Sequence, residues 1–380
     1  MSAGGERGVA ERLLTAGAVR EAARNMLQLA ERGDLPQWDV DLSRMDAAAD
    51  LTAETVRANY PDLKVPFHAR WRHFMAAGRD LWAEADKPSD PIELGRAAFD
   101  LVIPSVLLDA GAGPGWRYRD DTGAELSRSE GLGVASLRMW QSGALDDLSA
   151  VTEAAVAQAF QVSGDNPLVG VEGRAALLRR VGQAVGQPRR LFDMMAARAT
   201  AGALSAPEIL DVLLRELGPI WPGRLSLGGL PLGDCWPHPA AGLGYVPLHK
   251  LSQWMSYSLI EPLQWAGIEV TDVDGLTGLA EYRNGGLFID TGVLRLSNPD
   301  DRRIAHPVDS AVVVGWRALT VALLDRIAPM VRARLGVSAE AFPLARVLEG
   351  GTWAAGRRIA KQMRPDGGPP INVVSDGTVF

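Results

Sequence analysis

The chain has 380 residues, of which 47% are hydrophobic and 22% charged, the balance of a globular protein with a core of normal size. Its net charge of −7 argues against a nucleic-acid surface, and its single cysteine, Cys235, excludes an intrachain disulfide and a zinc site built on several thiolates. No segment approaches the roughly 20 apolar residues of a membrane span, and no signal peptide is recognisable. We therefore expect a cytoplasmic protein without membrane contact.

Helical patterns dominate the chain. Apolar residues recur at helical spacing in residues 9–31, 47–59, 70–85, 127–140, 149–161 and 172–185. A helix over 206–216 has its own start signal, because Ser205 can cap it and Glu208 lies three residues later. Three more helices are predicted over 249–265, 309–335 and 342–362, the last interrupted by two glycines. With short strands predicted only over 286–289 and 371–374, we expect a mainly α fold: one large helical domain with minor β-structure.

Two segments lack helical character. Residues 222–247 are rich in Gly and Pro, which predicts a long loop with short strands, and long loops inside compact chains are usually functional. Residues 86–91, Asp-Lys-Pro-Ser-Asp-Pro, have the composition of a linker. They suggest an N-terminal helical region over 1–100 and a main helical catalytic domain over 101–380.

Several standard motifs are missing, among them the phosphate-binding P-loop, the His-Glu-x-x-His metal motif and the nucleophile elbow. The five histidines lack metal-ligand spacing, so no metal or cofactor is expected, and His68 and His73 are assigned ordinary surface or core roles. The Gly-rich run after Asp109 resembles a dinucleotide fingerprint only superficially, because Pro114 and charged residues replace the expected helix start. A tight turn that brings Asp109 to a pocket wall is the favoured interpretation.

Many of the residues that could bind a ligand or catalyse a reaction lie between 249 and 290. His249 and Lys250 follow the Gly/Pro loop and open a helix, where backbone amides and a lysine can bind phosphate. The structural alternative is a solvated basic residue at a helix start.

Asp272, Asp274, Glu281 and Arg283 fall within twelve residues. Paired carboxylates can activate water and stabilise an oxocarbenium-like transition state, while an arginine fork binds phosphate. The alternative is a solvated loop with an internal Glu–Arg pair, which would contribute only about 0–1 kcal/mol to stability.

Two acids precede tryptophans on the last predicted helices. Asp309 lies seven residues before Trp316, and Glu349 lies four before Trp353, which places the second pair on one helix face. An aromatic plane can stack on a heterocycle or urea, although such tryptophans more often belong to the core.

Three motifs carry a resemblance to a known family. They are Val-Pro-Leu-His-Lys-Leu-Ser-Gln-Trp at 246–254, Leu-Thr-Gly-Leu-Ala-Glu-Tyr-Arg-Asn-Gly-Gly-Leu-Phe-Ile-Asp at 276–290, and Ser-Asp-Gly-Thr-Val-Phe at 375–380. They resemble the Urg-three-like family of the uracil-catabolism gene clusters, over about residues 19–380. The resemblance implies a pathway that degrades uracil through ribosylated, ring-opened intermediates.

A more distant resemblance links the chain to the queuosine-salvage nucleotide glycosidases. The run Ala-Glu-Tyr-Arg at 280–283 is similar to their Ala-Asp-Tyr-Arg, His249 and Lys250 stand where they have Tyr-Lys, and Asp272 corresponds to an aspartate ahead of that run. This resemblance implies a DNA-glycosylase-like helical architecture. The chain departs from the pattern at Glu281 and His249, so the chemistry can be shared while the base pocket differs.

The hypothesis is a hydrolase of the N-glycosidic bond in a ribosylurea-like or UMP-derived ring-opened nucleotide. Asp272 and Glu281 are the predicted catalytic residues. The predicted substrate-binding residues are Asp109, His249, Lys250, Tyr282, Arg283, Asp309, Glu349 and Trp353. Two alternatives stay open: an amidohydrolase acting on the opened ring, and a non-catalytic pathway partner that binds a nucleotide. The expected partner is a small nucleoside or nucleotide, and the sequence leaves the oligomeric state open.

Overall fold

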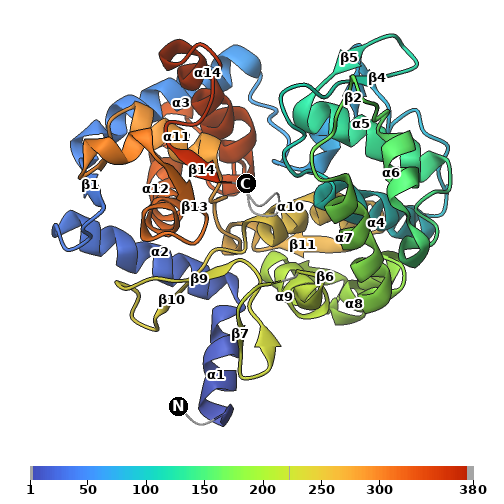
Figure 1. The fold of residues 1–380 in the computed structure, drawn as a ribbon, viewed down its shortest axis with the longest axis horizontal. Helices are drawn as coiled ribbons and strands as arrows, with labels where there is room; N and C mark the ends of the chain where they lie inside the picture. The colour runs from blue at the N-terminus through green and yellow to red at the C-terminus, as the bar shows by residue number, and fades with distance from the viewer. Residues whose placement is uncertain (1–2, 222, 375–380) are drawn as a thin grey trace. The chain divides into compact units, whose positions relative to one another are not determined.

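The computed structural model describes residues 3–221 and 223–374, and the motif at 375–380 lies outside them. The fold is mainly α-helical with short two-stranded sheets, as predicted (Figure 1). The chain divides into two compact units, each assembled from separate segments. Unit 1 comprises Met1–His68, Arg224–Gln253 and Asp272–Phe380, and unit 2 comprises Ala69–Gly223 and Trp254–Thr271.

Unit 1 is organised around one long helix, α12 (Ala311–Leu335). Ser310 caps its start and Gly336, with φ of 71°, ends it in the left-handed conformation. It packs against α2 (Ala16–Glu31), α3 (Met45–Asn59) and α11 (Tyr282–Asp290) (Figure 1). The remaining helical elements of unit 1 are α1 (Ala3–Leu13), η1 (Leu42–Arg44), η5 (Val273–Gly275), η6 (Pro299–Arg303), α13 (Leu344–Arg346), the π-helix η7 (Val347–Thr352) and α14 (Trp353–Met363).

Unit 1 also contains short two-stranded sheets. β1 (Trp38–Val40) pairs antiparallel with β12 (Leu294–Leu296), and β13 (Ala305–Pro307) pairs parallel with β14 (Asn372–Val374). The Gly/Pro-rich segment contains short strands, as predicted, and they pair as two hairpins: β7 (Ser226–Leu227) with β8 (Leu230–Pro231), and β9 (Cys235–Pro237) with β10 (Tyr245–Pro247). The predicted strand over 371–374 is confirmed as β14.

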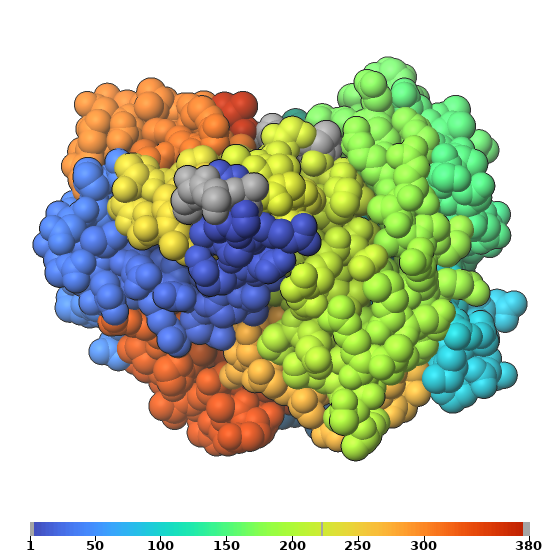
Figure 2. Space-filling model, turned by 90° about the horizontal axis from the view of Figure 1, so that it is seen from below, coloured from blue at the N-terminus to red at the C-terminus, as the bar shows by residue number. Residues whose placement is uncertain are grey.

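The second hairpin lies beside the N-terminal helices. Figure 2 shows them at one surface, the helices in blue and the hairpin in yellow. A cavity of about 720 Å³ lies between them, and residues such as Leu13, Met26 and Val246 line it. None of the predicted site residues borders this cavity.

Unit 2 is built on α4 (Pro91–Leu107), which Asp90 caps and whose second half is buried. Around it stand α5 (Arg128–Gln141), α6 (Glu153–Ala159), α7 (Val171–Val185), α8 (Arg189–Arg198) and α9 (Ala206–Glu216), with η2 (Arg70–His73), η3 (Leu148–Ala150) and η4 (Gly218–Ile220). The predicted helix over 206–216 is confirmed, with Ser205 and Glu208 forming its capping box. The remaining helix, α10 (Lys250–Trp265), begins in unit 1 and ends in unit 2.

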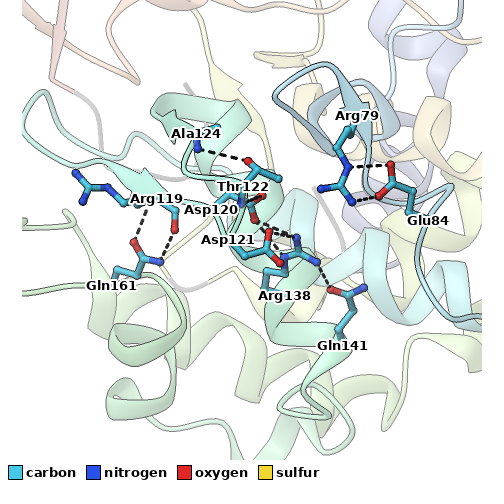
Figure 3. A network of polar contacts seen from close by, with 10 residues as sticks. All are labelled: Arg79, Glu84, Arg119, Asp120, Asp121, Thr122, Ala124, Arg138, Gln141 and Gln161. Atoms are coloured by element: carbon cyan, nitrogen blue, oxygen red, sulfur yellow. Dashed lines mark hydrogen bonds and ion pairs between the residues drawn. The ribbon is translucent and has the colours of Figure 1, made fainter.

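Unit 2 also contains short strands: the hairpins β2 (Met75–Ala76) with β3 (Arg79–Asp80) and β4 (Tyr118–Arg119) with β5 (Glu125–Leu126), and the parallel pair β6 (Ala203–Ser205) with β11 (Glu269–Thr271). Arg138 of α5 fixes the β4–β5 hairpin by donating to Asp120 at 3.0 Å and to Asp121 at 2.9 Å (Figure 3). Gln161 pairs with the backbone of Arg119 on the same hairpin.

Four predicted elements were wrong in type or extent, among them the helix over 149–161, which is limited to α6 because Thr152 caps its start. Residues 9–31 form two helices, because Thr15 caps a new start. Residues 70–85 form a 3₁₀ turn and a short hairpin instead of a helix, and Trp71 and Trp82 pack against each other there at 5.0 Å. Residues 286–289 lie inside α11 instead of a strand. In each case capping or tertiary packing overrides the local pattern.

Two further predictions concern a domain boundary and membrane-spanning helices. The predicted boundary at residue 100 falls within α4, whereas the two compact units are divided at other positions. Of the helices formed by residues 3–221 and 223–374, none has the length and apolarity to cross a membrane.

Candidate functional site

Glu281 begins the helix that carries the Glu-Tyr-Arg run. It is the N-cap of α11 and only 8% exposed. Its carboxylate accepts hydrogen bonds from the backbone N–H groups of Arg283 at 2.9 Å and Asn284 at 2.7 Å. Unpaired amides and the helix dipole both favour a negative charge at this position. Two of the roughly four acceptor sites of an ionised carboxylate are used in this way, which leaves capacity for a further donor.

Arg283, in the first turn of the same helix, is held by aromatic rings. Its guanidinium carbon lies 4.9 Å from the ring centroid of Tyr282 and 5.3 Å from that of Trp353, and the residue is only 7% exposed. Within the described ranges no carboxylate forms an ion pair with Arg283. An arginine stacked on aromatic faces keeps its planar set of N–H donors available for an anion.

Glu349 lies beside the same tryptophan and pairs with a histidine that sequence reasoning treated as ordinary. Its carboxylate oxygen is 2.6 Å from Nδ1 of His68, and the His68 ring lies 5.9 Å from the Trp353 ring. Both side chains are largely buried. A carboxylate that orients an imidazole is an arrangement suited to moving a proton.

The backbone around Glu349 is unusual. The predicted Gly-Gly interruption is the π-helix η7, which separates α13 from α14. Such insertions are rare and are often found at functional sites. Here η7 is followed directly by Trp353, the first residue of α14, so the carboxylate and the indole lie on successive turns.

Close backbone packing joins α14 to α11. A side chain at Gly356 would collide with the carbonyl oxygen of Arg283, so only glycine permits this approach. Thr352 donates a hydrogen bond to Asn284 at 2.9 Å, and both side chains are buried. We call the group of Glu281, Tyr282, Arg283, Glu349, Trp353 and His68 the α11 cluster. All six residues belong to unit 1.

His249 and Lys250 lie at the start of α10, as predicted, and also belong to unit 1. His249 is buried with φ of 47°, and its Nε2 lies 2.9 Å from the carbonyl oxygen of Leu13. Burial lowers the pKa of His249, which favours the neutral ring and an Nε2–H donated to that carbonyl. The backbone N–H of Lys250 donates to the carboxylate of Asp234 at 2.9 Å.

Asp272 and Asp309 differ from Glu281 in being exposed. Asp272 has φ of 49° and precedes η5, and no hydrogen bond or ion pair within residues 3–221 and 223–374 joins it to Glu281. Asp274, the other acid of this run, is paired with Arg332 at 2.7 Å. The roles assigned to Asp272 and Asp309 therefore stay predictions.

Asp109 lies in unit 2, after the end of α4. It is buried and forms an ion pair at 3.2 Å with Arg70, whose side chain is fully buried. Arg70 also donates to Ser105 at 2.7 Å, and its guanidinium lies 5.8 Å from the Trp254 ring. Asp109 is thus held in a buried polar group of its own unit, separate from the α11 cluster in sequence and in unit.

The Gly-rich run after Asp109 is a turn held by one arginine. Arg174 donates to the carbonyl oxygens of Ala110 at 2.9 Å and Gly111 at 3.1 Å. Burial lowers the pKa of Arg174 to about 10, and the charge of Asp109 opposes that shift. Because a helix precedes the run instead of a strand, the dinucleotide-fingerprint interpretation does not apply.

No group of three or more His, Cys, Asp or Glu side chains with the geometry of a metal site occurs in the part of the chain that the structure describes.

Comparison with known proteins places the chain in a family. Residues 12–380 match the family described as protein of unknown function DUF1688. The chain is 38% identical to protein urg3 of Schizosaccharomyces pombe over 395 residues, which span 97% of this chain and 98% of that protein. It is 34% identical to uracil catabolism protein 4 of Lachancea kluyveri over 431 residues, or 96% of this chain and 97% of the relative. The match over residues 12–380 shows that the chain belongs to the DUF1688 family.

Proposed function

We propose that this protein acts in uracil catabolism and hydrolyses the N-glycosidic bond of a ribosylurea-like or UMP-derived ring-opened nucleotide. The pathway is supported by the name of the Lachancea kluyveri relative, which aligns over almost the whole chain. The reaction is supported by one observation above all. In the α11 cluster, an arginine without a carboxylate partner in the described residues stands beside an aromatic plane and two carboxylates.

Each part of the α11 cluster suits one part of such a substrate. The Arg283 guanidinium matches a phosphate, to which it can donate two parallel N–H bonds. The half-buried Trp353 ring already lies against the guanidinium groups of Arg283 and Arg357, at 5.3 and 5.6 Å from its centroid, so a planar ureido group is expected to pack on its exposed part. Tyr282 stacks on Arg283 and so fixes the direction of the guanidinium.

The two carboxylates, Glu281 and Glu349, have different roles in the proposed reaction. As the C1–N bond breaks, positive charge develops on the ribose, and the carboxylate of Glu281 stabilises that charge. Water adds to C1, the leaving nitrogen takes up a proton, and the products are the free sugar phosphate and the ureido compound. His68 and Glu349 move the proton between water and the leaving nitrogen. Asp272 stays a candidate for water activation, which an Asp272→Asn variant tests.

The experiment is product analysis after incubation with N-ribosylurea 5′-phosphate. Ribose 5-phosphate and urea in equal amounts are the expected products. Release of ammonia and carbon dioxide with the C1–N bond intact would favour the amidohydrolase alternative instead. Binding of the compound without any product, in a panel that includes uridine and UMP, would favour the non-catalytic alternative.

A further inference from the structure

A buried ion pair is hydrogen-bonded to the start of α10 and to the residue that precedes the α11 cap. Arg317 of α12 and Asp234 of the Gly/Pro-rich segment form two parallel bonds, Nη1 to Oδ1 and Nη2 to Oδ2, both at 2.7 Å. The Arg317 side chain is 1% exposed and the Asp234 side chain 12%. Neither residue stands out in the sequence, and neither belongs to the predicted site.

Arg317 also holds the residue that precedes the Glu281 cap. Its Nε donates to the carbonyl oxygen of Ala280 at 3.1 Å. Ala280 is buried and covalently joined to Glu281, so this bond fixes the entry of the chain into α11. The planar guanidinium therefore binds Asp234 with its two terminal nitrogens and the Ala280 carbonyl with Nε.

Asp234 in turn holds the start of α10. Its Oδ2 accepts from the backbone N–H of Lys250 at 2.9 Å, and its own carbonyl oxygen accepts from the N–H groups of Leu248 and His249. Its Oδ1 also accepts from the indole N–H of Trp236 at 2.6 Å. Burial opposes the ionisation of Asp234, but the charge of Arg317 and these donors lower its pKa well below its ordinary value.

From this chain of bonds we infer that Asp234 and Arg317 are positioning residues that fix where Glu281 and Lys250 lie relative to each other. The inference deepens the proposed function and rests on it for its catalytic consequence. The pair touches neither the sugar nor the leaving group. It acts through Ala280 on the carboxylate that stabilises the transition state, and through the Lys250 backbone on the predicted phosphate-binding lysine.

A purely structural role predicts something different. A buried pair of this kind generally matters to folding, and removing one partner leaves a charge without compensation. Such a loss weakens the whole unit and does not single out one segment. The test therefore uses a substitution that keeps the charge beside Asp234 and loses the bond to Ala280, together with a control that loses the same two-bond fork elsewhere.

Arg317→Lys is that substitution, since a lysine can still pair with Asp234 but has no planar fork to reach Ala280 as well. A matched control exists in the same unit. Arg364 binds Asp290 in the same two-bond geometry, at 2.8 and 2.6 Å, and donates its Nε to the carbonyl oxygen of Gly368 at 2.7 Å. Because Asp290 is the last residue of α11, Arg364→Lys makes the same chemical change at the opposite end of the helix.

Two readouts are taken on folded, full-length protein. With N-ribosylurea 5′-phosphate, Arg317→Lys lowers kcat roughly tenfold or more with a smaller change in KM. The reason is that misplacement of a reacting group slows the chemical step more than it weakens substrate binding. Arg364→Lys keeps kcat within about twofold. In amide hydrogen exchange, the N–H groups of Arg283 and Asn284 exchange faster in Arg317→Lys only, while the core of α3 keeps its protection.

The outcomes separate this inference from the proposed function. If wild-type protein does not cleave the compound, the proposed function fails, and the exchange data still decide whether the pair fixes the Glu281 segment. If wild-type protein cleaves it and Arg317→Lys matches Arg364→Lys in both readouts, the inference is overturned. Faster exchange spread evenly over unit 1 also overturns it, because that result indicates general destabilisation.

Discussion

Arg138 and Arg283 are both helical arginines beside polar side chains, but their guanidinium groups meet different partners. Arg138 donates to Asp120, Asp121 and Gln141, so its charge is balanced within the β4–β5 region of unit 2 (Figure 3). Arg283 stacks between Tyr282 and Trp353 in unit 1 and forms no ion pair with any carboxylate of residues 3–221 and 223–374. The first arrangement stabilises a hairpin, and the second keeps a positive charge ready for an anion that a ligand supplies.

The largest expected effect is on Glu281. Glu281→Gln should lower kcat by about a thousandfold, within the range for a catalytic carboxyl group. The fold should survive, because the amide oxygen of Gln can still accept from one of the two N–H groups that the separate carboxylate oxygens bind, and a weakened cap costs about 0.5–2 kcal/mol. Steady-state kinetics and thermal unfolding measure the two effects. Glu208→Gln, at the first turn of α9, is the matched control and should keep full activity. Equal activity in the two variants would remove Glu281 from the mechanism.

The comparison of the two arginines predicts the next effect. Arg283→Lys should raise KM for the 5′-phosphorylated substrate roughly 10- to 100-fold, equivalent to about 1.4–3 kcal/mol of binding free energy. The same change should leave KM for the unphosphorylated ribosylurea almost unchanged. Arg138→Lys should alter neither KM and should cost at most about 1 kcal/mol of stability, because its contacts lie partly in solvent. If Arg138→Lys raised KM as strongly, the proposed difference between the arginines would be wrong.

The His68–Glu349 pair should behave as one unit. Glu349→Gln and His68→Gln are each expected to lower kcat about 10- to 100-fold, and the double variant should lose no more than the worse single variant. If the two residues act together, the double variant loses less kcat than the product of the two single losses. If they act independently, the two losses in kcat multiply. A double-mutant cycle on kcat measures this coupling. Fully multiplicative losses would show that the 2.6 Å contact does not serve the reaction.

A smaller effect concerns stability and pH. Because burial lowers the pKa of His249, the unfolded chain binds a proton below about pH 6.5 that the native state does not take up. Stability should therefore fall as the pH drops from 7 to 5. His249→Asn should reduce this fall by at most about 1.4 kcal/mol per pH unit, and Asn tolerates the φ of 47°. Denaturant unfolding at both pH values measures it. His238, whose pKa burial also lowers, accounts for part of the remaining slope, so an unchanged slope in His249→Asn would contradict the assignment.

How far the sequence predicts the fold depends on where each helix gets its stability. The helix over 206–216 was predicted to the residue because Ser205 and Glu208 carry its start signal locally. Residues 286–289 were predicted as a strand because their local pattern is apolar and β-like. They are helical because Glu281 caps α11 and because Gly285 lets the helix pack closely on Trp316. The contact with Trp316 comes from another segment and leaves no trace in the local pattern.

The site was predictable to a similar degree. Resemblance and helical spacing singled out Arg283, Glu349 and Trp353, which the structure brings together. His68 was missed because 281 residues separate it from Glu349, and no local motif marks it. The Arg317–Asp234 pair was missed for the same reason, since its members are 83 positions apart in the sequence.

The most direct test of the proposed chemistry is a mass-spectrometric time course of N-ribosylurea 5′-phosphate with wild-type protein and Glu281→Gln in parallel. We expect ribose 5-phosphate and urea to accumulate together with the wild type and to be almost absent with the variant. Accumulation of ammonia while the sugar–nitrogen bond stays intact, or equal cleavage by both proteins, would contradict the assignment of glycosidic cleavage to the α11 cluster.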